Sequence, residues 1–218
     1  ENKLTYAGLK KQEEFSWLKE VEAQPLSQVN MDLNKAYKNT FNSKFGFPKF
    51  KSKKYSKKSY RTAVGMKVNG RYFYVSKVGW VKMAEELRFK GKLMNVTISQ
   101  TKSGKYFATF LVDAENFQQE PVANNIGLDL GLTHFCITSA GEKIDNNRFY
   151  RSLEQRLMRE QRKLSKRLEV AKKHNRKLDE CRNYQKQKVK VARIHEKIAN
   201  QRTDFLHKLS SRLTDENQ

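Results

Sequence analysis

Positive charge is concentrated in two blocks of this chain, and a nearly neutral segment separates them. Residues 31–90 carry a net charge of +13 and residues 151–218 carry +11, whereas residues 91–150 sum to −1. The total of +22, from 45 Lys and Arg against 23 Asp and Glu, exceeds what solubility requires. This distribution is typical of a basic surface around a folded centre, and it indicates a polyanionic partner.

Several protein classes are excluded by composition. The 13 Phe, 9 Tyr and 2 Trp are enough to build a core, which argues against wholesale disorder. No apolar run approaches the roughly 18 to 20 residues of a membrane span, and no signal-peptide pattern opens the chain. Cys136 and Cys181 form no CxxC pair, so neither a zinc site nor a disulfide framework is expected. We expect a cytoplasmic protein without a membrane partner.

The first part of the chain is predicted to be helical and to lead into a basic loop. The helix is expected to begin near Pro25, with Gly46 and Pro48 ending it. Its apolar residues recur at helical spacing: Leu26, Val29, Leu33, Tyr37 and Phe41. Residues 49–61 then combine seven cations with three aromatic rings and no acid. Cations for phosphate and rings for bases indicate nucleic-acid contact, although lysine runs are also common on plain solvated surfaces.

Strand patterns follow, and then helices. Residues 67–115 alternate as in a small antiparallel sheet or barrel, with KSGK as a turn between its last two strands. The sequence IGLDLG predicts a hairpin that carries Asp129 as a carboxylate on its buried side. Apolar residues at spacings of three and four over residues 151–213 predict two long basic helices, antiparallel around the polar KKHNRK segment.

Asp129 is the residue whose context favours catalysis, and it has a structural alternative. A strand aspartate near a turn can simply hydrogen-bond to the local backbone. Metal-dependent phosphodiester cleavage needs several carboxylates around two ions, which one Asp cannot supply. The four histidines lack the HExxH spacing of a metal site, and the glycines form no nucleotide-binding loop.

The order of these segments resembles the transposon-encoded TnpB (OrfB) proteins, relatives of the type V CRISPR effectors. The matching blocks are SWLKEVEAQPLSQ, NKAYKNTF, GFPKFKSKK, KSYRT, VGWVKM, NVTISQTKSGKYFATFLVD, IGLDLGLTHFCITSAGEKIDN and ARIHEKIANQRTDFLHKLSSRL. They run over nearly the whole chain in the order of the family. The resemblance implies an RNA-guided, magnesium-dependent DNA endonuclease whose partners are a guide RNA and target double-stranded DNA.

The resemblance also implies an α+β multidomain fold. Residues 1–66 resemble part of a helical recognition lobe with a basic loop, and residues 67–120 resemble the wedge domain, a small antiparallel β-barrel. Residues 121–218 resemble the start of an RNase-H-like (RuvC) α/β nuclease domain that carries a long helical hairpin as an insertion. We therefore expect the nucleoid region of a prokaryotic cytosol as the place of action.

Residue roles follow by position from the same resemblance. Asp129 matches the first RuvC carboxylate, a ligand of Mg²⁺. The residues expected to read the motif beside the DNA target are Tyr6, Gln24, Ser27, Gln28, Tyr60, Arg61 and Thr62. Those expected to contact the nucleic-acid backbone are Lys49, Lys51, Lys53, Lys54, Lys57 and Lys58. Ser27 and Gln28 stand where relatives often carry paired amides, so the preferred motif is expected to differ.

The chain departs from the family at both ends. The second and third carboxylates and the zinc-binding CxxC module would follow residue 218, so Zn²⁺ is expected only there. We expect a portion of a larger nuclease that is inactive alone. Two alternatives stay open: a nuclease-dead, RNA-guided DNA-binding repressor, and a general basic nucleic-acid-binding protein without a guide.

Overall fold

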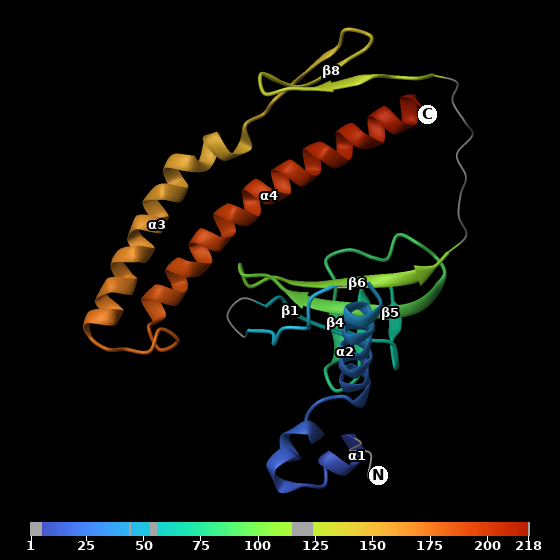
Figure 1. The fold of residues 1–218 in the computed structure, drawn as a ribbon, viewed down its shortest axis with the longest axis vertical. Helices are drawn as coiled ribbons and strands as arrows, with labels where there is room; N and C mark the ends of the chain where they lie inside the picture. The colour runs from blue at the N-terminus through green and yellow to red at the C-terminus, as the bar shows by residue number, and fades with distance from the viewer. Residues whose placement is uncertain (1–5, 44, 53–55, 115–123, 218) are drawn as a thin grey trace. The chain divides into compact units, whose positions relative to one another are not determined.

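The computed structural model of the protein describes residues 6–43, 45–52, 56–114 and 124–217. The chain forms two compact units, one from α1 to β6 and the other from β7 to α4 (Figure 1). The architecture is mixed α+β, with three small antiparallel sheets and two long C-terminal helices. The division into three domains at residues 66/67 and 120/121 stays a prediction.

The first unit begins with helices. They are α1 (Tyr6–Leu9), the 3-10 helix η1 (Glu13–Lys19) and α2 (Ala23–Ser43). The predicted helix near Pro25 is thus confirmed, and it ends at Ser43, ahead of Gly46. Its apolar stripe is not buried, because Val29 and Phe41 remain 62% and 71% exposed.

Two three-stranded sheets complete the first unit. Their strands are β1 (Lys58–Thr62), β2 (Lys67–Asn69), β3 (Tyr72–Val75), β4 (Gly79–Lys82), β5 (Lys92–Gln100) and β6 (Tyr106–Asp113), in the orders β1-β5-β6 and β2-β3-β4. Phe73 of β3 packs edge-on against Phe110 of β6 at 5.6 Å, which joins the sheets. The described strands do not close into the predicted barrel, since each sheet has its own pair of edge strands.

The basic run after α2 was predicted to be a loop over residues 49–61, and part of that prediction is wrong. Lys58–Thr62 form strand β1, which pairs antiparallel with Val96–Gln100 of β5. A ladder to a strand far along the chain overrides the local preference of a lysine-rich segment. Lys53 and Lys54 lie outside the described residues.

The second unit starts with the sheet that carries Asp129. Its strands β7 (Leu128–Leu130), β8 (His134–Thr138) and β9 (Lys143–Asp145) pair antiparallel in that order. The predicted hairpin is confirmed, with Asp129 opposite Ile137. The predicted buried side is wrong, because Asp129 is exposed. In the described residues, β7 forms an edge of the sheet and leaves this position open to solvent.

Two helices follow the sheet and pack antiparallel, as their spacing predicted. They are α3 (Phe149–Lys173) and α4 (Arg182–Glu216). Their shared core consists of Leu157, Val191, Ile194 and Ile198, with Leu153 and Leu164 packed against it. Charged residues on the other faces remain in water, which is how an amphipathic pair stays stable.

One buried polar side chain also ties the two helices together. The amide nitrogen of Gln187, on α4, donates to the Glu160 side chain at 2.6 Å and to the Glu160 carbonyl at 3.0 Å. The hydrogen bond from Gln187, followed by one from Lys163, lowers the pKa of the Glu160 carboxyl. Because the buried amide has its partners, it fixes the register of the helices at little cost.

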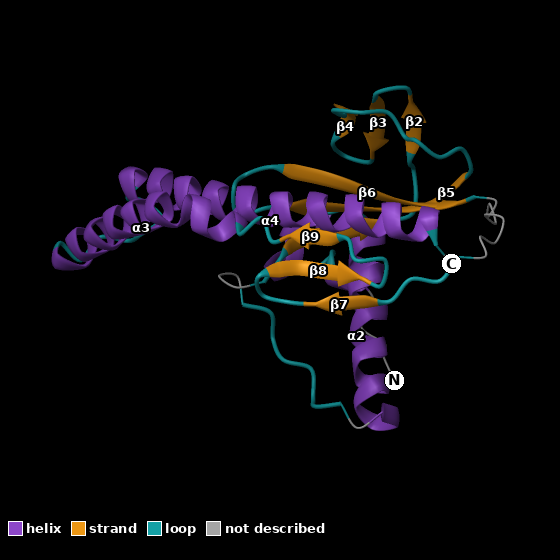
Figure 2. Cartoon of the chain, turned by 90° about the horizontal axis from the view of Figure 1, so that it is seen from above, coloured by secondary structure: helices purple, strands orange, loops and turns teal. Residues whose placement is uncertain are grey.

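Helix α4 also contacts the sheet of the second unit (Figure 2). Phe205 of α4 meets Phe135 of β8 at 5.2 Å and Phe149, at the start of α3, at 6.0 Å. Arg212 of α4 forms an ion pair with Glu142 at 3.0 Å. The same helix therefore holds both α3 and the sheet. Among the described helices, none has the length and apolar character to cross a bilayer.

Removing the central leucine of the hairpin core tests this packing. Leu157 is 2% exposed. The Leu157→Ala variant should therefore lose about 2 to 5 kcal/mol of unfolding free energy through lost burial and the cavity left behind. Leu206→Ala on α4, where the side chain is 48% exposed, is the matched control and should change it by about 0.5 kcal/mol or less. Equal losses in urea unfolding would contradict the assignment of the core.

Candidate nucleic-acid interface

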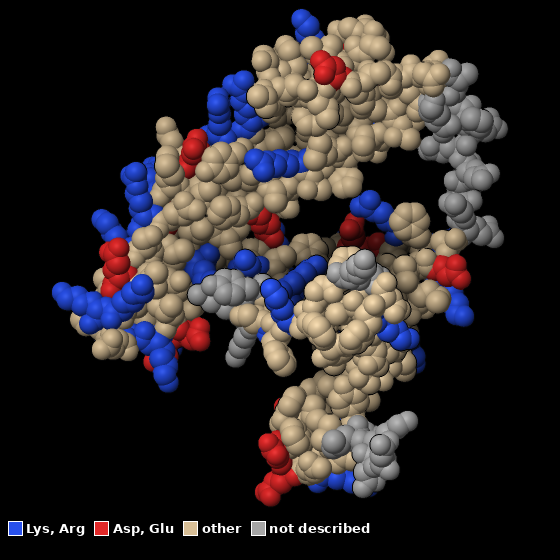
Figure 3. All heavy atoms as spheres, in the orientation of Figure 1, with Lys and Arg blue, Asp and Glu red and all other residues tan. Residues whose placement is uncertain are grey.

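Cations cover much of the described surface of the second unit. Figure 3 shows Lys and Arg side chains along the α3–α4 hairpin and around its turn, with fewer acids between them. Several of the acids pair with a neighbouring cation, as Glu160 does with Lys163 at 3.0 Å and Asp204 with Lys208 at 2.9 Å. Such exposed pairs contribute little to stability. The unpaired remainder gives the surface its positive potential.

In the first unit, the start of α2 meets strand β1. The Thr62 hydroxyl, on a residue only 1% exposed, donates to the Glu22 carboxylate at 3.4 Å. Partial burial, followed by the negative charge of Glu22, raises the pKa of the neighbouring Tyr60. A glutamate just ahead of α2 therefore links the helix to the strand.

Several residues expected to read a DNA motif lie around this junction. Gln24, Ser27 and Gln28 lie on the first turns of α2, while Tyr60, Arg61 and Thr62 lie on β1, which contacts α2. Gln28 donates to Asp32 at 3.0 Å. Thr62 is buried, and alternation along β1 points Arg61 to the face opposite Tyr60. Thr62 therefore contributes through Glu22 in this structure. Motif reading itself stays a prediction.

Tyr6 is the remaining motif-reading residue, and it begins α1 as a half-buried side chain. Its carbonyl accepts a hydrogen bond from the Lys10 backbone at 3.0 Å. The structure thus gives Tyr6 a helical position, whereas the other six predicted residues belong to α2 and β1.

The described lysines of the basic run are open to solvent. Lys49, Lys51, Lys57 and Lys58 are exposed, and so is the whole ring of Phe50. No ion pair with a described carboxylate neutralises these four amines. They are therefore free to meet phosphate, which is the role that the sequence predicts for them.

Asp129 projects from β7 into solvent. Within the described residues no hydrogen bond or ion pair engages its carboxylate. Across the ladder it shares a face with Ile137, which in turn pairs with Lys143. The free carboxylate is suited to bind a hard cation. In the described part of the chain, however, no group of three or more Asp, Glu, His or Cys residues could hold a metal ion. One ligand is present, and a two-ion site is not.

Sequence reasoning missed two features of these surfaces. Glu22 was not singled out, because its partner Thr62 lies 40 residues further along the chain. The turn between α3 and α4 was described only as a polar break, yet it gathers cations from both helices. Neither feature has a local sequence signal, since each depends on which segments the fold brings together.

The fold and its cationic surfaces define an α+β protein of the kind that binds polyanions. Residues 109–218 match the OrfB_IS605 family, described as "Probable transposase". The chain therefore belongs to this family.

Two curated relatives extend the match over most of the chain. The chain is 34% identical over 202 residues to "Putative RNA-guided DNA endonuclease InsQ" of Escherichia coli (strain K12), which covers 91% of this chain and 47% of that protein. It is 33% identical over 219 residues to "Putative RNA-guided DNA endonuclease" of Streptomyces pristinaespiralis, covering 96% and 50%. The chain thus spans about half the length of these relatives.

Titration of Tyr60 tests the junction of α2 and β1. The difference in ultraviolet absorbance between the chain and its Tyr60→Phe variant should titrate above pH 10, the ordinary value for tyrosine. Because the folded pKa exceeds the unfolded one, the stability that Tyr60 contributes is present below pH 10 and is lost as pH rises through the folded pKa.

Glu22→Gln removes the negative charge and should lower the midpoint for Tyr60. Glu20→Gln, close by in sequence, is the control and should leave it in place. A midpoint at or below the ordinary value, or one unmoved by Glu22→Gln, would contradict the described contact.

Proposed function

We propose that this chain is the guide- and target-binding half of an RNA-guided DNA endonuclease of the TnpB type. Its membership of the OrfB_IS605 family is the observation that carries the proposal. The names of the two relatives and the cationic surfaces support it. Base pairing between the guide and one DNA strand supplies sequence choice, while the protein supplies cations along the backbone and reads a short motif.

Asp129 is proposed as the first carboxylate of an RNase-H-like nuclease centre. Its exposed position on β7 and its free carboxylate support this role. Magnesium would polarise the phosphodiester and lower the pKa of an attacking water. The described residues supply one ligand and do not complete such a site. We therefore assign Mg²⁺ to Asp129 only in a protein that adds further carboxylates, with action in a prokaryotic cytosol.

A second candidate function is guided binding without cleavage. The lack of any described cluster of three metal-ligating side chains favours it for this chain taken alone. A nuclease-dead relative would keep the guide RNA and occupy DNA as a repressor. The two functions share every cationic surface and differ only at the nuclease centre.

Cleavage assays separate these candidates. The 218-residue chain with guide RNA and Mg²⁺ should leave a matched duplex intact, because a single carboxylate cannot hold two ions. A full-length protein containing this sequence should cleave it, and Asp129→Asn should abolish cleavage there. Asp145→Asn, an exposed carboxylate of the same sheet, is the control. Cleavage by the 218-residue chain, or undiminished cleavage by full-length Asp129→Asn, would contradict the role of Asp129.

Guide dependence separates the proposal from general basic binding. The full-length protein with its guide should bind a matched duplex on the order of 10³-fold more tightly than a scrambled duplex of equal length. Filter binding at one fixed salt concentration measures both affinities. Equal affinity for the two duplexes would support a basic nucleic-acid-binding protein that uses no guide.

A further inference from the structure

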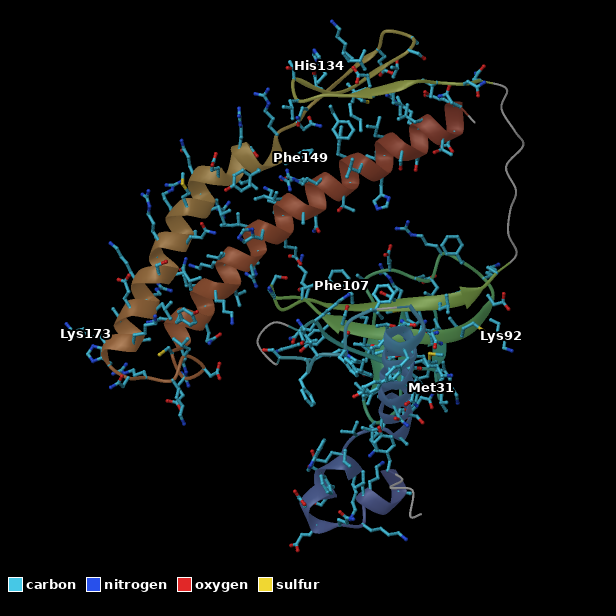
Figure 4. The ribbon with its side chains drawn as sticks, in the orientation of Figure 1. Met31, Lys92, Phe107, His134, Phe149 and Lys173 are labelled. Carbon is cyan, nitrogen blue, oxygen red and sulfur yellow. The ribbon has the colours of Figure 1, made fainter. Side chains whose placement is uncertain are left out.

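A cavity lies where helices α3 and α4 turn back on each other, at the end of α3 that Lys173 marks in Figure 4. Its volume is about 620 Å³, within the range of sites that hold nucleotide-sized ligands. Its walls carry cations from both helices and from the turn between them: Lys166, Arg167, Arg176, Arg182 and Lys186. We call these five residues the elbow cations.

The elbow cations differ from other cations of the hairpin in having no carboxylate partner. Lys163, Lys208 and Arg212 each lie within 3.0 Å of an acid. None of the elbow cations forms an ion pair within the part of the chain that the structure describes. The one acid of the cavity, Glu180, lies 4.0 Å from Lys177 instead. Five like charges around one cavity repel each other unless an anion enters.

The backbone around the cavity is fixed by hydrogen bonds. Arg167 donates from Nη1 to the Asn183 carbonyl at 2.6 Å, which ties α3 to the start of α4. Arg176 donates from its backbone to Ala171 at 3.0 Å, and the Gln185 side chain donates to Leu178 at 2.8 Å. The elbow is therefore preorganised, so a ligand need not order it on binding.

The chemistry of the walls favours a phosphodiester over other anions. Three of the elbow cations are arginines, whose planar guanidinium matches two oxygens of a phosphate. The same cavity has an apolar part formed by Val170, Ala171 and the ring of Tyr184. A carboxylate or an inorganic anion leaves that part unused, whereas a sugar and base can lie against it.

We propose that the elbow of the α3–α4 hairpin binds the phosphodiester backbone of a nucleic acid, with one nucleoside against Val170 and Tyr184. This inference rests on the proposed function, because it names a site where that nucleic acid is held. It assigns binding to the hairpin turn, away from Asp129 and from the lysine run.

A pair of charge-matched variants tests the site. Arg176→Gln/Arg182→Gln/Lys186→Gln removes three elbow cations and leaves Arg167 with its structural hydrogen bond. Arg193→Gln/Lys197→Gln/Arg202→Gln removes the same charges from exposed positions of α4 outside the cavity. Both variants of the 218-residue chain should retain the circular dichroism and the thermal midpoint of the unchanged chain, which shows that they fold.

The probes are a labelled 20-nucleotide single-stranded RNA and a DNA duplex of the same length. The elbow variant should lower the slope of log K against log salt by about 2 for the single strand or nearly 3 for the duplex, at 0.7 to 0.9 per phosphate. The α4 control should change it by less than about 1. The probe that shows the larger difference identifies whether RNA or DNA occupies the elbow. Equal changes in the two variants would overturn the proposal.

The cavity also contains a natural reporter. Cys181 lines it, and the other cysteine of the chain, Cys136, is 1% exposed and shielded from reagents. Saturating RNA or DNA should slow alkylation of Cys181 at least about fivefold, whereas polyglutamate of equal charge should not. Polyglutamate protection equal to that of nucleic acid would overturn the assignment to a phosphodiester.

The outcomes distinguish failure of the site from failure of the function. If neither probe binds the unchanged chain at low salt, the proposed function fails together with the site. If the probes bind, but Cys181 is not protected and the two variants behave alike, the elbow site fails and the proposed function stands.

Discussion

The apolar contact between helices α3 and α4 is the constraint on which the second unit depends. The segment over residues 151–218 carries a net charge of +11, so these helices repel each other at every distance. They pack because Leu157, Val191 and Ile194 are removed from water along one line, with Gln187 bonded to Glu160 inside it. Since α4 also holds the sheet through Phe205, loss of this contact would release Asp129 from its support.

The same arrangement explains why the cations can serve binding. The apolar contact uses one face of each helix, which leaves the remaining faces to Lys and Arg. A chain that gained most of its stability from ion pairs would have little free charge for a ligand. Here the elbow cations keep their charge unpaired while Lys163 and Lys208 pair locally with acids. Stability and polyanion binding therefore rest on different side chains of the same two helices.

Much of the fold could be predicted from local patterns. The spacing of leucines and isoleucines predicted α3, α4 and their antiparallel packing, and KSGK predicted the turn in which Gly104 adopts a φ of +91°. Long-range pairing could not be predicted. Lys58–Thr62 become a strand because β5 offers a free edge, and the sheets stay separate where a barrel was expected.

The candidate sites divide in the same way. Asp129 was found because its glycine-flanked strand has a local signature, although its exposure was not predicted. Glu22 and the elbow cations have no such signature, since the fold brings distant segments together to form them.

Sequencing of the RNA that copurifies with the full-length protein tests the central claim, that this cationic chain carries a guide. The account predicts a discrete RNA species with a constant portion joined to a variable end. Recovery of no RNA, or of fragments that mirror the abundant RNAs of the cell, would contradict it.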